Sequence, residues 1–263
     1  MAQLRTLAVP VGVLAAVLLF LLVNPWIVLE GTISQVVTVA FWLSFGLLLV
    51  ILFSLRDDPD AENIEVEGPA FTRFLFNNPR AGLFWLPIRL FVGFQWLEAG
   101  WHKIQDPAWV GADAGTAILG FWQSAVGVEG GESSITYEWY SSFIQFLIDN
   151  NLQTPFSYAI AFGETAVGLG LLVGALTGIA AFFGALMNMS FLLAGSASTN
   201  PIMFTLSVGL MLAWKVAGYY GLDRYLLPLL GTPWRQHTHG EPGPTSPAGP
   251  AREEDAPGAA ATG

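Results

Sequence analysis

The sequence predicts an all-α polytopic membrane protein that crosses the bilayer six times. Of the 263 residues, 53% are hydrophobic and only 11% are charged. A soluble domain carries about 25% charged residues, so the chain is too poor in charge for that class. The apolar residues also gather in runs of about the length that crosses about 30 Å of hydrocarbon as a helix.

Two apolar runs near the N-terminus predict a transmembrane hairpin over residues 1–55. Leu7–Leu29 and Ile33–Leu55 are each long enough to span, and a short turn separates them. A cleaved signal peptide, with Arg5 as its charged start, is the competing interpretation. The first run is too long for a signal peptide, and no small-residue cleavage site follows it.

Residues 56–84 are expected to form an acidic cytoplasmic linker that ends in an interfacial segment. The linker begins with the polar sequence RDDPDAENIEVE. Phe71, Phe74 and Leu75 follow it and predict a short helix that lies on the membrane face.

Four further apolar stretches predict a four-helix core over residues 85–231. They run from about Trp85 to Lys103, from Phe156 to about Ala175, from Gly178 to Leu193, and from Ile202 to Tyr220. Thr154-Pro155 and Asn200-Pro201 each place a capping residue before a proline, which is typical of a helix start.

The loop at residues 105–154 and the tail at residues 232–263 complete the expected organisation. The loop is long and rich in aromatic residues, and this favours an interfacial or partly re-entrant helix that folds over the bundle as a lid. An aromatic belt that only anchors the bundle is the alternative. The tail is rich in Pro, Gly and Ala and is expected to be disordered.

The distribution of arginine predicts the orientation in the membrane. With six spans, both termini lie on one side, and that side carries Arg5, Arg56, Arg73, Arg80, Arg224, Arg235 and Arg252. The opposite loops offer only Lys103. The positive-inside rule therefore places both termini in the cytoplasm of a multi-pass protein of the cell membrane, with the long loop outside.

Ionisable residues inside the predicted spans form the candidate site, because charges in hydrocarbon are costly and usually functional. Glu98, His102 and Glu164 are the candidate catalytic residues. Glu98 and His102 are four residues apart and can touch, either as a proton-handling pair or as a packed hydrogen-bonded pair. At about 1.5 Å rise per residue, Glu98 lies roughly 8 Å below the outer rim, Glu164 and Asn188 roughly 12 Å, and Arg89 roughly 21 Å.

Several polar and aromatic residues are expected to bind substrate. They are Lys103, Arg89, Trp96, Trp101, Asn188 and Asn200. Lys103 lies at the outer rim near helix N-termini, where a small anion would be favoured, although it could instead cap its own helix and reach water. Arg89 could bind a ligand, form an ion pair with Glu164, or donate hydrogen bonds to carbonyl groups. Asn188 could equally join helices.

The composition excludes several classes of cofactor and partner. Because the chain has no cysteine, it has no thiolate metal site and no Fe–S cluster. It has three histidines, two of them in the tail, and this excludes bis-histidine haem within one subunit. We therefore expect no haem, no Fe–S cluster and no metal, and any redox cofactor must be borrowed, diffusible or bound without covalent ligation. The net charge of −10 without a basic face argues against nucleic acid.

Three stretches of the core resemble the DoxX/DoxD family. They are LPIRLFVGFQWLEAGWHKIQDPAW with Arg89, FGETAVGLGLLVGALTGIAA with Glu164, and GSASTNP followed by AGYYGLDRY. The likeness covers about Trp85 to Leu230, and its last stretch is more similar to the DoxD branch, the small membrane subunit of thiosulfate:quinone oxidoreductase. The resemblance implies a four-helix bundle that passes electrons from a reduced sulfur compound to membrane quinone, normally with a second redox subunit.

The residues and the resemblance together suggest an integral membrane redox subunit. A thiosulfate-like anion would dock at the outer rim, and the quinone would approach between helices lined by Trp96, Trp101 and the aromatic loop. Glu98 or Glu164 would exchange the protons that quinone reduction requires. A non-catalytic scaffold that recruits a partner oxidoreductase is the alternative. A small proton-coupled transporter ranks third, because no inverted repeat or broken helix favours it.

Overall fold

The computed structural model describes residues 2–23, 27, 29, 31–55, 68–127, 131–232 and 234, and these residues form helices and turns without a strand. Within this described part of the chain, three helices are long and apolar enough to cross a membrane: Thr6–Val23 within α1 (Ala2–Val23), α2 (Gly31–Leu55) and α7 (Gln153–Val173). The all-α class is therefore confirmed, and the apolar helices indicate a membrane protein. The expected acidic linker at 56–67 and nearly all of the tail lie outside the described residues.

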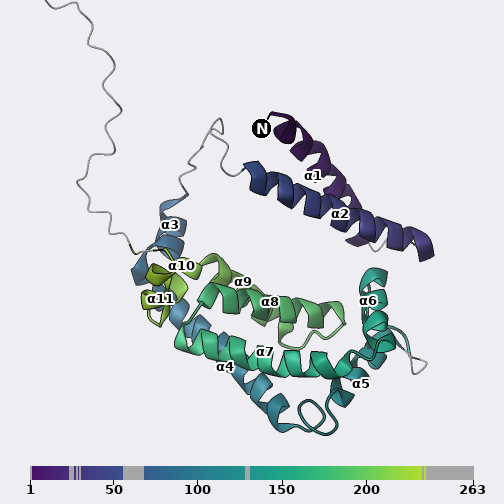
Figure 1. Ribbon diagram of the computed structural model, residues 1–263. Coiled ribbons are helices and arrows are strands. Elements are labelled where there is room, and N and C mark those ends of the chain that lie inside the picture. Colours follow the sequence, from purple (N-terminus) through teal and green to yellow (C-terminus); the bar gives the residue numbers. More distant parts are fainter. Residues whose placement is uncertain are drawn as a thin grey trace, which may run out of the picture.

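The first two helices, α1 and α2, pack against each other as a hairpin (Figure 1). Large apolar side chains such as Trp42 and Leu43 are exposed on it. Two of its hydroxyl groups bond within their own helix: Thr38 donates to the carbonyl of Ser34, and Ser44 donates to that of Phe41, both at 2.9 Å. The hairpin surface therefore suits a hydrocarbon environment.

A short amphipathic segment leads into the bundle. It consists of α3 (Ala70–Asn77) and the 3₁₀ helix η1 (Pro79–Ala81). Phe71 and Phe74 are exposed on α3, and the Trp85 indole donates a hydrogen bond of 2.9 Å to the carbonyl of Leu75. The short helix expected around Phe71 and Phe74 is thus present and attached to the bundle.

Four helices make the core: α4 (Gly82–Gln105), α7, α8 (Thr177–Leu193) and α9 (Asn200–Leu212). α4 packs along α7, and α8 packs along α9, so the core consists of two helix pairs (Figure 1). Glycines set the close approach of the first pair. A Cβ atom on Gly100 would lie 2.5 Å from the amide nitrogen of Thr165, and one on Gly168 would clash with the backbone of Leu97. Because these two glycines have no side chains, the backbones of α4 and α7 can touch.

The long loop forms a separate cap at one end of the core. It contains α5 (Thr116–Val126) and α6 (Glu138–Asp149), which share an apolar cluster that includes Ile118, Trp122 and Ile144. Hydrogen bonds attach the cap to the bundle on both sides: the Tyr140 hydroxyl donates to the carbonyl of Ser190 at 2.9 Å, and the Ser157 hydroxyl donates to that of Trp109 at 2.6 Å. A helix was expected here, and the structure adds α5 as a second one.

The sixth predicted span, Ile202 to Tyr220, is wrong as an uninterrupted helix. α9 ends at Leu212, and the chain continues as the single turn α10 (Trp214–Ala217) and then as α11 (Asp223–Leu229). The break places Trp214 against the start of α8, where a Cβ atom on Gly178 would lie 2.6 Å from that of Trp214. It also brings the following turn to the end of α7, opposite the cap.

Candidate functional site

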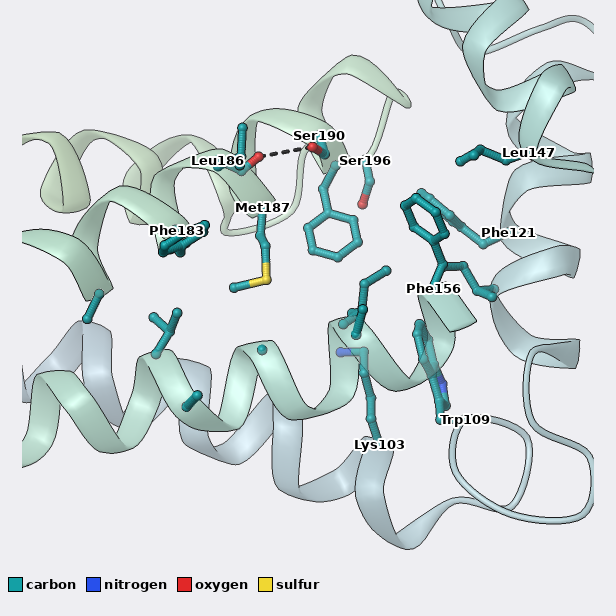
Figure 2. A pocket seen from close by; sticks show the side chains of 18 of the residues that line it. Lys103, Trp109, Phe121, Leu147, Phe156, Phe183, Leu186, Met187, Ser190 and Ser196 are labelled. Carbon is teal, nitrogen blue, oxygen red and sulfur yellow. Dashed lines mark hydrogen bonds between the residues drawn. The ribbon is translucent and has the colours of Figure 1, made fainter. Parts of the chain in front are cut away.

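A long apolar groove runs between α7 and α8 and has a volume of about 840 Å³ (Figure 2). One wall consists of residues on a single face of α7, among them Phe156, Ile160, Gly163, Val167 and Gly170. The opposite wall comes from α8 and includes Ile179, Phe183, Leu186, Met187 and Ser190. Trp109, Phe121, Trp122, Tyr140 and Leu147 of the cap close one end. The volume lies in the range of about 300–1,000 Å³ found for small-molecule sites.

The groove is elongated and opens sideways. Its lining on α7 extends from Phe156 to Gly170, which corresponds to roughly 21 Å at about 1.5 Å per residue. Ile179, Phe183 and Leu186 line it, yet their side chains are about half exposed. The groove is therefore open along the outer surface of the two helices, and its shape suits a long apolar chain.

Of the described residues that line the groove, only Lys103 carries a charge. Its ammonium nitrogen lies 2.7 Å from Oε2 of Glu164 and 5.1 Å from the centre of the Trp109 ring. The Lys103 side chain is 20% exposed, whereas that of Glu164 is 1% exposed. The carboxylate is thus enclosed by protein, and the ammonium group can be reached from the groove (Figure 2).

The packing of α4 on α7 positions this ion pair. Lys103 lies in the last turn of α4, on the same face as Gly100, three residues earlier, where the two helices touch. Glu164 is adjacent to Thr165, which Gly100 faces, so its side chain enters the interface between the helices. An ammonium group has three N–H donors. One of them is directed to Glu164, and two remain for a ligand in the groove.

Two hydroxyl groups at the capped end of the groove, those of Tyr140 and Ser190, already have partners. Tyr140 donates to the carbonyl of Ser190, and the Ser190 hydroxyl donates to that of Leu186 at 3.0 Å. Burial raises the pKa of Tyr140 above its usual value, and this keeps its phenol protonated at neutral pH. Tyr140 and Ser190 therefore hold the cap on α8, whereas Lys103 is the charged donor available to a ligand.

Arg89 lies at the other end of α4 and does not pair with Glu164, so the alternative of an Arg89–Glu164 ion pair is wrong. The Arg89 side chain is 2% exposed, and its Nη2 donates to the carbonyl of Tyr220 at 3.1 Å. Asp223 is the nearby opposite charge, and its carboxylate accepts hydrogen bonds from the amides of Leu176 and Thr177 at 2.6 and 2.9 Å. The alternative in which Arg89 donates to a carbonyl is confirmed, while its Nε and Nη1 have no hydrogen-bond partner among the described residues.

Glu98, Trp101 and His102 lie on the exposed outer face of α4. Successive residues of a helix are 100° apart, so these three residues lie opposite Gly100 and Lys103. Only the face with Gly100 and Lys103 packs on α7. Within the described chain no hydrogen bond or ion pair joins Glu98 to His102. Of the three candidate catalytic residues, Glu98 and His102 therefore lie away from Glu164, and Trp101 does not line the groove.

Trp96, Asn188 and Asn200 also lie outside the groove lining. Trp96 and Asn188 are buried in the bundle, and the Trp96 indole nitrogen and the Asn188 amide nitrogen have no hydrogen-bond partner among the described residues. The Asn200 amide donates to the carbonyl of Ser196 at 2.8 Å and so closes the turn between α8 and α9. Of the residues expected to bind substrate, only Lys103 reaches the groove.

The groove itself was missed from the sequence, although α7 carries a usable signal. Gly163, Ala166 and Gly170 are small residues at spacings of three and four, and all three line the groove. Small residues at such spacing usually mark close helix packing. Gly170 fits that rule, because a Cβ atom there would lie 3.3 Å from that of Ala180 on α8, whereas Gly163 faces the side chain of Met187 across the groove.

Comparison of the chain with protein-family models, with curated proteins and with solved structures finds no match. The described residues contain no group of three or more His, Asp or Glu side chains placed to hold a metal ion. The groove and its ion pair are therefore the observations from which function is argued.

Proposed function

We propose that this chain is a multi-pass membrane protein that binds a membrane quinone in the α7–α8 groove and serves as the quinone-binding subunit of an oxidoreductase. The observation that carries the proposal is the combination of a long, laterally open apolar groove with a single ion pair of zero net charge at its side. The groove suits an isoprenoid chain, and the two free N–H groups of Lys103 suit a carbonyl oxygen.

The topology supports entry of the ligand from the bilayer. α7 has 21 residues, which corresponds to roughly 32 Å and matches a hydrocarbon core of about 30 Å. Because α4, α8 and α9 pack alongside it or one another, we infer that they cross with it, and the N-terminal hairpin brings the number of spans to six. α3, η1 and α11, which carry Arg73, Arg80 and Arg224, gather at the end opposite the cap, and this supports cytoplasmic termini (Figure 1).

The electrostatics favour a neutral ligand over an anion. Glu164 lies 2.7 Å from the ammonium group, so its carboxylate already compensates the charge of Lys103. An anionic headgroup or a thiosulfate ion at this position would also be repelled by Glu164, and this repulsion offsets a large part of its attraction to Lys103. A quinone carbonyl needs only a hydrogen-bond donor. We therefore place the quinone head at Lys103, and we assign the reduced sulfur anion to a partner subunit.

The proposed reaction is a two-electron reduction of quinone to quinol. The electrons come from a reduced sulfur anion: two thiosulfate ions form one S–S bond in tetrathionate and release two electrons at the partner. Each quinone carbonyl oxygen takes one proton as the ring is reduced: one comes from Lys103 and one from water, and water then returns a proton to Lys103. Lys103 stabilises the developing negative charge on one oxygen and passes it a proton, and Glu164 holds the ammonium group in place before the transfer.

A groove-blocking variant tests the proposal. Ala166→Phe places a bulky side chain in the groove, whereas Leu169→Phe adds a comparable ring on the exposed surface of the same helix and serves as the control. Labelling of the purified protein by a photoreactive quinone should fall strongly in Ala166→Phe and stay unchanged in Leu169→Phe. Equal labelling of both variants would show that the quinone does not bind in this groove.

A non-catalytic scaffold is the second candidate function, and the exposed outer face of α4 favours it. That face carries the polar residues Glu98 and His102, which a partner protein would have to cover. The two functions differ in one measurement. A scaffold holds the partner oxidoreductase in the membrane without binding quinone, so the labelling would be absent from the unaltered chain while the partner still co-purifies.

A further inference from the structure

The outer face of α4 carries an exposed stripe of residues that repeats with heptad spacing. Its members, separated alternately by three and four residues, are Phe84, Pro87, Phe91, Phe94, Glu98, Trp101 and Gln105. Such spacing is the pattern by which one helix packs along another. The described elements that contact α4 most, α7, α9 and α10, pack against other faces of it. The stripe is thus a helix-packing surface that the described part of this chain leaves uncovered.

Glu98 belongs to this stripe, and it lies within the hydrocarbon layer if α7 crosses the bilayer as the proposed function requires. Its neighbour Leu97 touches Gly168, which is five residues from the middle of α7 at residue 163. That corresponds to roughly 7.5 Å along the helix, at about 1.5 Å per residue. Half of the hydrocarbon thickness is about 15 Å. The Glu98 carboxyl group therefore lies well inside the hydrocarbon layer and on the outside of the bundle.

An ionisable side chain at this depth normally faces protein rather than lipid. Glu98 has no hydrogen-bond or ion-pair partner among the described residues. In the described part of the N-terminal hairpin, the hydroxyl groups of Thr38, Ser44 and Ser54 donate to carbonyls of their own helix and so are not directed to Glu98. A partner that covers this face and brings a donor would satisfy the Glu98 carboxyl group.

We propose that this stripe of α4 is the docking face for a transmembrane helix of a different protein, which presents a Lys, Arg, Asn or Gln side chain opposite Glu98. Phe91, Phe94 and Trp101 provide the apolar and aromatic surface on either side of that contact. A second copy of this chain fits less well. A two-fold axis along the membrane normal would place Glu98 against its own counterpart, and two carboxylates repel each other.

Site-specific photo-cross-linking in the native membrane tests this interface. The cross-linker p-benzoylphenylalanine replaces Trp101 on the stripe, and in the control it replaces Phe162, an exposed residue of α7. We expect position 101 to yield a peptide from a membrane-spanning segment of another protein with Lys, Arg, Asn or Gln within one helical turn, and position 162 to yield lipid adducts. Lipid adducts at both positions, or a second copy of this chain at position 101, would overturn the proposal.

Variants of Glu98 separate the role of the carboxyl group from that of the apolar surface. The amount of the cross-linked partner that co-purifies should fall roughly tenfold or more in Glu98→Leu, because a hydrogen bond to a charged group is lost, and less in Glu98→Gln. Equal recovery with Leu, Gln and Glu at this position would contradict the assigned contact.

Two further measurements distinguish failure of the interface from failure of the proposed function. Quinone labelling of the groove should be the same in Glu98→Leu and in the unaltered chain, because Glu98 and the groove lie on different faces.

The chain contains no cysteine, so a Glu98→Cys variant has a single thiol. Rapid labelling of that thiol by a membrane-impermeant maleimide after removal of the partner would place position 98 in water. That result would overturn the proposed topology and, with it, the argument for this interface.

Discussion

Removal of the Lys103 ammonium group should destabilise the bundle more than removal of the whole ion pair. Lys103→Met leaves the Glu164 carboxylate in place, and that side chain is 1% exposed. Loss of one partner from a buried ion pair typically costs about 3–5 kcal/mol, because the other charge remains buried without compensation. Replacement of both partners by apolar residues of similar size is often close to neutral. We therefore expect the double variant Lys103→Met, Glu164→Leu to recover most of the stability lost in Lys103→Met.

A double-mutant cycle measures this coupling directly. The free energy of unfolding is obtained for the unaltered chain, both single variants and the double variant, by titration of mixed micelles with sodium dodecyl sulfate and detection by circular dichroism. The pair at 2.7 Å predicts a coupling energy of about 1–3 kcal/mol. Met187→Leu, a groove residue with no charge, serves as the control for general loosening of the helices. If the two single-variant losses simply add in the double variant, Lys103 and Glu164 do not interact and the site described above is incorrect.

Two further predictions concern the ends of the bundle. Tyr140→Phe removes the hydrogen bond to Ser190 and should lower the free energy of unfolding by about 0.5–1.5 kcal/mol. Because burial raises the pKa of Tyr140, its stabilising contribution is complete below the unfolded pKa of about 10 and declines as the pH rises above it. Unfolding measured between pH 9 and 11 should show a smaller decline in the Phe variant. Gly174→Ala should destabilise by more than about 1 kcal/mol, because Gly174 has a φ of 66° and a Cβ there would collide with the Arg89 guanidinium. Gly120→Ala, on the exposed side of α5, is the control, and equal stability of the two variants would contradict the packing of Arg89.

The sequence predicted that α4 has two different faces. It identified only some of the residues on the face that packs against the rest of the bundle. Helical spacing separates Arg89, Gly100 and Lys103 from Glu98 and His102, and the structure preserves that separation. Both faces carry ionisable residues, so polarity alone did not show that Glu98 points outward. The glycines on one face are the better signal, because a backbone without side chains marks the contact with α7.

The break after α9 and the groove depend on contacts between distant segments, so local patterns could not reveal them. The apolar run from Ile202 to Tyr220 looks continuous, and hydropathy contains no sign that Asp223 returns to cap the start of α8. Leu176 adopts a left-handed conformation with a φ of 49° in the turn between α7 and α8. Residues with branched side chains rarely do so. The direction in which α8 leaves this turn determines the space between the helices, and so it determines the groove.

The pairing of Lys103 with Glu164 bears on how the proposed reaction is divided between proteins. A lysine without a carboxylate beside it would have suited an anionic electron donor, but this lysine has a carboxylate at 2.7 Å. A neutral quinone head is the better ligand for the pair, and the anion must then be oxidised outside this groove. Lys103 faces the groove, whereas Trp101 and His102 lie on the opposite side of the same helix, within its diameter of about 10 Å. A partner helix docked on the stripe of α4 would therefore lie one helix away from the quinone site, which is the short separation that electron transfer between two subunits requires.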